Sequence, residues 1–161
     1  MRPRRGGNTL DKERFVSEIE AHSGMLYRVA WSILRNDDDC KDALQETALK
    51  AWEKRNTLRE TSYFRTWITK ILINACYDTQ RKRHRIVSLD SIPDIPVSVP
   101  DPALSMALAT LPEKLRLPLV LVFSEGMTYA EAAETLHLPL ATVRGRIHRG
   151  KEQLRKELTA E

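Results

Sequence analysis

Cationic side chains gather near the C-terminal end of this 161-residue chain. Between residues 144 and 156 only Glu152 is acidic, and the cationic residues are Arg144, Arg146, Arg149, Lys151, Arg155 and Lys156. Arginine can donate two hydrogen bonds to guanine, and both arginine and lysine hold phosphate. A second basic run, Arg-Lys-Arg-His-Arg, lies at residues 81 to 85. Each run alone is as compatible with a solvated helix face as with a nucleic-acid site. The predicted elements that carry the two runs are therefore needed to distinguish these interpretations.

The residues around the C-terminal basic cluster have the order of a helix-turn-helix. Residues 128 to 131, Thr-Tyr-Ala-Glu, form a capping box that starts a short helix, and His137, Leu138 and Pro139 form a tight turn after it. The next helix buries residues at helical spacing, namely Val143, Ile147, Gly150 and Leu154. Its outward face presents Thr142, Gly145, Arg146 and Arg149, flanked by Arg144, His148 and Lys151. Such a helix fits a major groove, and an αα-hairpin with a solvated basic face is the plain alternative.

Upstream of residue 84 the apolar residues recur at helical spacing in three stripes. The first is Met25, Leu26, Val29, Ala30 and Ile33; the second is Leu44, Thr47, Ala48, Ala51 and Trp52; the third is Phe64, Trp67, Ile68, Ile71, Leu72 and Ala75. A capping cluster at residues 36 to 38 and a polar loop at residues 56 to 62 separate them. Three such stripes can close one helical core.

Residues 85 to 102 are rich in proline, serine and aspartate, a composition that prevents a helix and favours an extended linker of at most about 60 Å. After it, Pro112 is expected in the first turn of a helix that Pro118 bends or delays and that Gly126 ends. We therefore predict an all-α chain of two small helical domains joined by an extended linker. The predicted parts are a disordered basic tail (1–10), a helical domain (11–84), a flexible linker (85–102) and a helix-turn-helix domain (103–161).

Composition sets limits on the partners. The net charge of +4 permits a nucleic-acid partner without requiring one. Cys40 and Cys76 lack CxxC spacing and nearby histidine pairs, so no disulfide framework, zinc site or other cofactor is expected. No stretch approaches about 18 consecutive apolar residues, and no signal-peptide core follows the basic N-terminus. These features predict a protein of the reducing cytoplasm without membrane insertion.

Three motifs in the last third of the chain carry a family resemblance. They are Leu-Pro-Glu-Lys-Leu-Arg at residues 111 to 116, Gly-Met-Thr-Tyr-Ala-Glu-Ala-Ala at 126 to 133, and residues 138 to 150. Together they resemble region 4 of extracytoplasmic-function sigma factors, a subfamily of the sigma-70-type factors of RNA polymerase. His137 and Ala141 stand where that family usually has glycine. In the family this module reads the minus-thirty-five promoter element, which implies that Thr142, Arg144, Arg146 and Arg149 contact DNA.

Residues 39 to 47, Asp-Cys-Lys-Asp-Ala-Leu-Gln-Glu-Thr, and Lys-Ala-Trp at 50 to 52 carry a second resemblance. They are similar to region 2.2 of the same family, which docks on the clamp helices of the polymerase beta-prime subunit. With Leu44, Ala48, Ala51 and Trp52 inward, an acidic and amide face with an apolar spot remains toward solvent. On the residues alone a solvated face is the plainer interpretation. The resemblance makes this face the site for core RNA polymerase, and it also implies the beta flap as a partner. The residues of the face are Asp39, Asp42, Gln45, Glu46 and Leu49.

Residues 64 to 71, Phe-Arg-Thr-Trp-Ile-Thr-Lys-Ile, and the polar residues after them resemble regions 2.3 and 2.4, which engage the minus-ten element. The polar residues form one stripe beside the core stripe, namely Lys70, Asn74, Tyr77, Asp78 and Arg81. Lysine and arginine can hold phosphate, asparagine and aspartate can contact bases, and tyrosine can stack on an unpaired base. Phe64 and Trp67 fall in the core stripe and are predicted to pack there. By family analogy the loop of residues 55 to 62 captures an extruded base.

The resemblance covers residues 12 to 84 and 103 to 158 and implies a sigma factor without catalysis of its own. Such a factor binds core RNA polymerase, directs promoter-specific initiation on promoter DNA and is expected to have an anti-sigma factor. The linker acidic residues Asp90, Asp94 and Asp101 either help it occupy an RNA channel or lie in a plain tether.

Other function classes explain less of the chain. A response-regulator output domain shares the helix-turn-helix but not the blocks at residues 39 to 52 and 64 to 83. An enzyme would need polar residues that converge on one site, whereas here they are spread over solvent faces. A bundle that only binds proteins leaves the basic face without a purpose.

Overall fold

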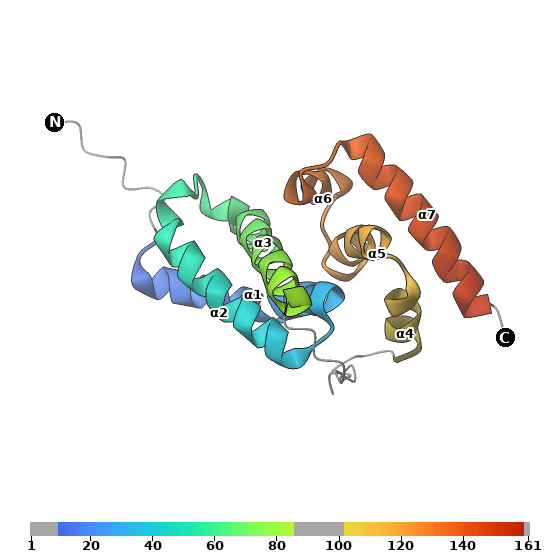
Figure 1. Cartoon of the computed structure of the whole chain (residues 1–161). Helices are drawn as coiled ribbons and strands as arrows, with labels where there is room; N and C mark the ends of the chain where they lie inside the picture. The colour runs from blue at the N-terminus through green and yellow to red at the C-terminus, as the bar shows by residue number, and fades with distance from the viewer. Residues whose placement is uncertain (1–9, 86–101, 160–161) are drawn as a thin grey trace.

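The computed structural model describes residues 10–85 and 102–159, except for the side chains of residues 84, 85 and 102. The elements are α1 (Lys12–Leu34), α2 (Asp37–Glu53), short 3-10 turns at Arg55–Thr57 and Thr61–Tyr63, α3 (Phe64–Arg85), α4 (Pro102–Thr110), α5 (Glu113–Leu119), a π-helical turn at Val120–Ser124, α6 (Tyr129–Leu136) and α7 (Leu140–Thr159). Every described element is helical and the elements form two groups (Figure 1), which confirms the predicted fold class. The predicted tail, apart from Leu10, and the linker, apart from its end residues, lie outside the described residues.

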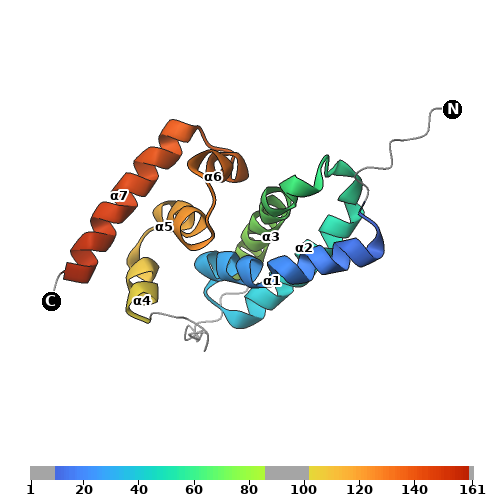
Figure 2. The same ribbon diagram turned by 180° about the vertical axis from the view of Figure 1, so that it is seen from behind.

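The N-terminal domain packs α1, α2 and α3 against one another (Figure 2). Asp11 caps α1 by accepting a hydrogen bond from the Arg14 amide, and Asn36 caps α2 in the same way through the Asp39 amide. Leu10 was predicted to belong to the disordered tail, but its side chain is 1% exposed in the core. The apolar side chain of Leu10 is removed from water, so the packed chain begins before the α1 cap.

The inward face of α2 is rotated from the predicted one. Its buried residues are Cys40, Ala43, Thr47 and Ala51, whereas Leu44, Ala48 and Trp52 are only half-buried. The Trp52 ring lies at the edge of the core, where it meets Phe15 edge-on at 5.2 Å and the Arg55 guanidinium covers it at 4.0 Å. Because the large Trp52 ring lies at the edge of the core, the small residues of α2 make its closest contacts with the other helices. The buried stripe therefore shifts toward Ala43.

The C-terminal domain begins with α4 and α5, and Pro112 takes the cap position of α5 rather than its first turn. Pro118 is buried inside α5 and does not delay its start; a π-helical turn follows, in which the Glu125 amide donates to the Val120 carbonyl at 3.0 Å. Gly126, with φ of 70°, ends the segment as predicted. Helix α7 crosses α5 so closely that a Cβ on Gly150 would lie 2.7 Å from Leu119 Cδ1.

The two domains pack on each other, α1 against α5 and α3 against α6 (Figures 1 and 2). This contact explains why Ser32 is buried although it lies off the first stripe. Arg116 is buried as well, and its Nε donates to the Ser32 carbonyl at 2.7 Å. In the described ranges, 10–85 and 102–159, no helix combines the length and the apolar character that a membrane span requires.

Candidate nucleic-acid interface

The helix-turn-helix is formed by α6 and α7 and has the predicted local structure. Thr128 and Glu131 form the reciprocal capping box of α6. His137 ends α6 in the left-handed region with φ of 54°, a conformation that glycine adopts at lower cost. Helix α7 buries Val143, Ile147 and Gly150, while Leu154 is half-buried. The helix therefore has one face fixed in the domain and one face toward solvent.

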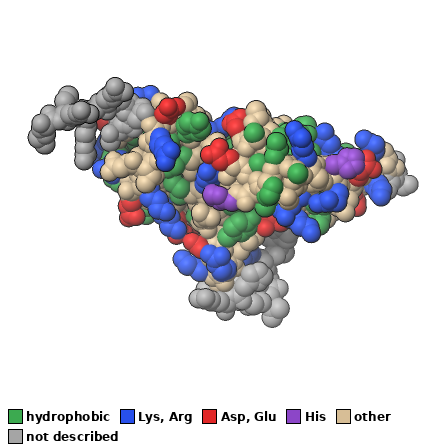
Figure 3. Space-filling view, turned by 90° about the horizontal axis from the view of Figure 1, so that it is seen from above, with side chains coloured by type: hydrophobic (Ala, Val, Ile, Leu, Met, Phe, Trp, Pro, Cys, Tyr) green, Lys and Arg blue, Asp and Glu red, His purple; other side chains and the backbone are tan. Residues whose placement is uncertain are grey.

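The outward face of α7 carries the predicted minus-thirty-five residues. Arg144 and Arg149 are exposed, and Thr142 and Arg146 are half-buried. Basic side chains gather over the end of the molecule that α7 forms (Figure 3). Lys151 is held there by the exposed Phe123, whose ring centre lies 4.3 Å from Nζ. This face can offer arginine forks to base edges and point charges to phosphates.

The polar stripe of α3 divides into two parts. Asn74 and Arg81 are exposed, whereas Lys70, Tyr77 and Asp78 are half-buried. Asp78 pairs with Arg81 and accepts from Lys50 Nζ on α2 at 3.4 Å. Partial burial opposes ionisation of Asp78, but the hydrogen bonds from Lys50 and Arg81 outweigh it and hold the pKa of the carboxyl below its ordinary value. Asp78 is therefore an anion that orients two cations.

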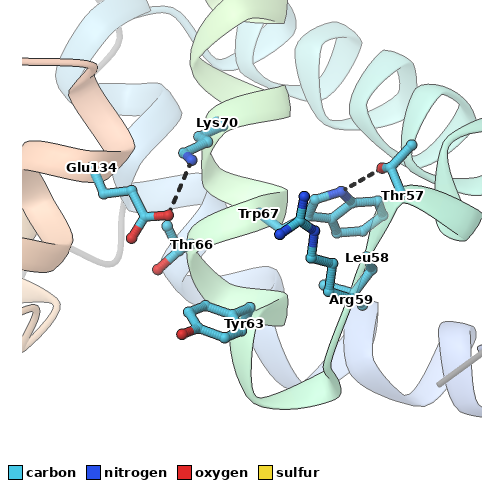
Figure 4. Close-up of a pocket in the computed structure, with 8 residues that line it drawn as sticks. All are labelled: Thr57, Leu58, Arg59, Tyr63, Thr66, Trp67, Lys70 and Glu134. Atoms are coloured by element: carbon cyan, nitrogen blue, oxygen red, sulfur yellow. Dashed lines mark hydrogen bonds and ion pairs between the residues drawn. The ribbon is translucent and has the colours of Figure 1, made fainter. Parts of the chain in front are cut away.

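A cavity of about 380 Å³ opens beside the start of α3 (Figure 4). Its lining residues are Thr57, Leu58, Arg59, Tyr63, Thr66, Trp67, Lys70 and Glu134. Phe64 is buried as predicted, but Trp67 is only half-buried, because its ring forms a wall of this cavity and its Nε1 donates to Thr57 Oγ1 at 3.0 Å. Tyr63 is 52% exposed at the cavity. The volume falls within the range of about 300–1,000 Å³ typical of ligand pockets.

The predicted polymerase face of α2 is partly tied up by ion pairs. Asp42, Gln45 and Leu49 are exposed, and Leu49 is 67% exposed. Glu46 lies 2.9 Å from Lys50 one turn on, and Asp39 accepts from Arg83 of α3 at 2.7 Å. The Asp39–Arg83 pair joins α2 to α3, whereas the Glu46–Lys50 pair lies within α2. An open apolar and polar patch centred on Leu49 remains.

Lys70, a predicted minus-ten residue, meets α6 across the domain contact. Lys70 Nζ lies 3.5 Å from Glu134 Oε1 on α6. Burial raises the pKa of the Tyr77 phenol, Glu113 adds to this rise, and the positive charge of Arg146 opposes it. Glu134 and Tyr63 were not among the predicted site residues. Glu134 was missed because nothing in the sequence indicates that α6 contacts α3. Tyr63 was missed because it lies outside both the apolar stripe and the polar stripe of the predicted third helix.

Comparisons with known proteins agree with this geometry. Residues 19–86 match the family model for Sigma-70 region 2, and residues 102–154 match Sigma-70, region 4. The ECF RNA polymerase sigma factor SigE of Mycolicibacterium smegmatis is 32% identical over 155 residues, which cover 87% of this chain but only 60% of SigE. RNA polymerase sigma factor SigV of Bacillus subtilis is 31% identical over 156 residues, which cover 93% of this chain and 94% of SigV.

Solved sigma factors share the arrangement of the helices. RpoE of Bartonella quintana, in complex with the anti-sigma factor NepR, superposes with a TM-score of 0.80 at 25% identity over 92% of this chain and 99% of its own. CnrH, in complex with the cytosolic domain of CnrY, has a similar fold, with a TM-score of 0.71 at 24% identity. Since both regions match in order and SigV aligns over most of its length, the chain belongs to the sigma-70 family and, within it, to the extracytoplasmic-function sigma factors.

Proposed function

We propose that this sigma factor directs initiation through three surfaces: α2 binds core RNA polymerase, α3 engages the minus-ten element, and α7 reads the minus-thirty-five element. The observation that carries the proposal is the division of α7 into a buried face and a basic outward face. A helix held in this way can enter a major groove without losing its packing. The chemistry of RNA synthesis belongs to the polymerase, so the chain itself needs no catalytic group.

The polymerase site is the exposed patch of α2. Asp42 and Gln45 offer acceptors to arginines of the beta-prime clamp helices, and Leu49 adds apolar area that the free chain leaves in water. Asp39 and Glu46 belong to the same face and support it through their pairs with Arg83 and Lys50. Region 4 then meets the beta flap on the same enzyme.

The minus-ten site combines the α3 stripe with the adjacent cavity. Tyr63 and Trp67 present aromatic surface to the cavity, and Lys70 brings a positive charge to its rim. An extruded base can stack on aromatic rings while its phosphate meets a cation. The cost of unstacking a base, a few kcal/mol, is thereby offset. These lining residues are our assignment for the base-capturing function of the loop at 55 to 62.

An anti-sigma partner and a cytoplasmic location complete the proposal. The solved relatives RpoE and CnrH are bound to regulators, and RpoE is bound to an anti-sigma factor. We infer that this chain also has an anti-sigma partner and that it works in the cytoplasm, where core RNA polymerase lies.

The affinity for core RNA polymerase tests the proposed surface of α2. Asp42→Arg combined with Glu46→Arg should weaken binding to core RNA polymerase, because the new charges meet arginines of the partner, at a cost of several kcal/mol. Affinity is measured by titrating labelled sigma factor with core enzyme. Lys41→Glu, which changes an exposed residue of the same helix in the opposite sense, is the control. Equal core affinity of the double variant and the wild type would refute this surface.

A further inference from the structure

Asp78 is the acidic residue of the α3 stripe that we propose for the minus-ten strand. Each phosphate of a DNA strand carries a negative charge, so a carboxylate beside the strand opposes binding. An aspartate can offset this cost by accepting a hydrogen bond from the amino group of a cytosine. Such a contact requires carboxylate oxygens that are free to meet a base.

The Asp78 carboxylate is instead held by a cation at each oxygen. Oδ1 accepts from Arg81 Nη2, one turn further along α3, and Oδ2 accepts at 3.4 Å from Lys50 Nζ on α2, the helix beside α3 in Figure 1. Burial opposes ionisation of Asp78, but these hydrogen bonds outweigh it and keep the pKa of the carboxyl below its ordinary value. Only 35% of the Asp78 side chain remains in solvent.

Lys50 has a second carboxylate partner on its own helix, since its Nζ lies 2.9 Å from Glu46 Oε1. Glu46, Lys50, Asp78 and Arg81 thus form a row of alternating charges, which we call the α2–α3 charge row. Its two positive and two negative charges balance, so the row attracts a phosphate backbone less than its two cations alone would. Arg81, with 67% of its side chain in solvent, is the member that a strand reaches most easily.

The pair with Asp78 restricts what Arg81 can bind. A guanidinium is planar and its donors form a rigid fork, so the donors that Asp78 does not use point in defined directions. A strand that is seated in the correct register can place a phosphate against these donors. An unrestrained arginine would follow the backbone of any strand, because phosphate contacts carry no sequence information.

We propose that Asp78 determines specificity for the minus-ten strand by restraining Arg81 and Lys50, and not by contacting a base. The inference rests on the proposed function of α3. Asp78 is then a positioning residue that lowers the affinity for arbitrary strands more than the affinity for the matched strand. A contact that penalises the wrong partner is a general route to specificity.

Binding of single-stranded DNA to the holoenzyme tests this role. One fluorescent oligonucleotide carries the minus-ten strand of a promoter that is mapped from transcripts of the wild-type holoenzyme, and the other has the same bases in shuffled order. We expect Asp78→Asn, which keeps the side-chain shape, to bind the shuffled strand about threefold more tightly, the size of one surface ion pair. Affinity for the matched strand should change little, so the preference falls about threefold. The salt dependence for the shuffled strand should become steeper, because one more phosphate is neutralised.

A double-mutant cycle shows whether the effect passes through Arg81. In an Arg81→Ala background, Asp78→Asn should lose most of its effect on the shuffled strand. Asp78→Ser, which removes the charge together with the carboxamide shape, should change the preference in the same direction as Asp78→Asn. If Asp78 only joins α2 to α3, its variants would unfold at lower urea concentration and keep the wild-type strand preference, which would overturn the proposal.

The matched control is Asp38→Asn, which makes the same charge change at an exposed position in the first turn of α2. An equal gain for the shuffled strand in Asp38→Asn and Asp78→Asn would reduce the effect to overall charge and overturn the restraint. A loss confined to one base of the matched strand would also overturn it, because Asp78 would then contact that base. Equal binding of both strands by the wild-type holoenzyme would instead overturn the proposed function of α3.

Discussion

Arg146 differs from the other arginines of α7 because it lies on the proposed DNA-reading face and is half-buried. It is half-buried, and its charge acts on Tyr77 of α3, whereas Arg144 and Arg149 are fully exposed on the same helix. A partly enclosed arginine loses less freedom when it forms a forked bond to guanine. At the scale of single residues, Arg146 is therefore the best candidate for base reading.

The corresponding prediction compares Arg146→Ala with Arg155→Ala. Loss of Arg146 should relax specificity at one minus-thirty-five position, at a cost of about 1–3 kcal/mol for the preferred base. Arg155 is exposed and pairs with Glu152 at 3.7 Å, so its loss should weaken all sequences slightly and equally, in a way that salt screens. Competition binding with single-base promoter variants at two salt concentrations distinguishes the two. Equal losses for every variant with Arg146→Ala would assign this arginine to phosphate.

A second prediction at this scale concerns Asn74 and Arg81, the exposed members of the α3 stripe. Asn74→Ala and Arg81→Ala should reduce open-complex formation more than core binding, because both side chains are exposed on α3 and lie outside the proposed polymerase face of α2. Permanganate reactivity of unpaired thymines in the holoenzyme complex measures the opening. Lys82→Ala removes an exposed cation outside the stripe and serves as the control. Wild-type melting in both stripe variants would show that the stripe has been misassigned.

At the scale of elements, the recognition helix depends on close contact with α5. A Cβ on Gly150 would meet Leu119 Cδ1 at 2.7 Å and the Leu115 carbonyl at 3.4 Å, whereas a Cβ on Gly145 would meet only the Arg149 guanidinium at 3.5 Å. The first contact forces packed groups to move, and the second is ordinary contact with a flexible side chain. Gly150 is therefore required for the close packing of α7 on α5, whereas Gly145 is not.

Gly150→Ala should destabilise the protein and Gly145→Ala should stabilise it. Alanine improves helix propensity by about 1 kcal/mol at either position, but overpacking costs about 1–3 kcal/mol where Leu119 must shift. We expect a net loss of about 1 kcal/mol for Gly150→Ala and a gain of up to about 1 kcal/mol for Gly145→Ala. Urea unfolding followed by circular dichroism measures both. Equal stabilisation in the two variants would mean that α7 does not approach α5 this closely.

At the scale of the whole molecule, the domain contact depends on ionised carboxylates. The hydrogen bond from Arg65 and the capping amide of Thr128 hold the pKa of Glu131 below its ordinary value, against the opposing effect of burial. A carboxyl whose folded pKa is lowered contributes stability above its unfolded pKa, and this contribution disappears as the pH falls through the folded pKa. Acid should therefore weaken the docked arrangement.

Glu131→Gln tests this linkage, because glutamine keeps the capping box and removes the charge. At about pH 7 the variant should unfold at lower urea concentration than the wild type, and the gap should close as the pH falls below the ordinary carboxyl range. Unfolding midpoints of both proteins across this range provide the measurement. A gap that stays constant at low pH would show that the charge of Glu131 does not contribute to stability.

Local patterns in the sequence determined the elements and the order of the sites. The capping box at Thr128 and Glu131, the turn before Pro139 and the spacing of Val143 and Ile147 each act within a few residues, so they identified the helix-turn-helix without tertiary information. The burial of Phe64 was also predicted correctly, because helical spacing within the third stripe is a local pattern. The α2 face shifted, and Trp67 and Leu154 are half-buried rather than buried, because periodicity alone does not show which edge of a stripe packs most closely.

The tertiary structure alone decided how the two domains meet. The burial of Ser32 and Arg116 and the position of Glu134 beside Lys70 depend on residues from distant parts of the chain, with Lys70 and Glu134 separated by 64 positions. An ion pair between such residues leaves no periodic trace, since it depends on how two finished helices cross. The sequence therefore yields a prediction of what each surface binds, whereas only the tertiary structure showed that α6 packs on α3.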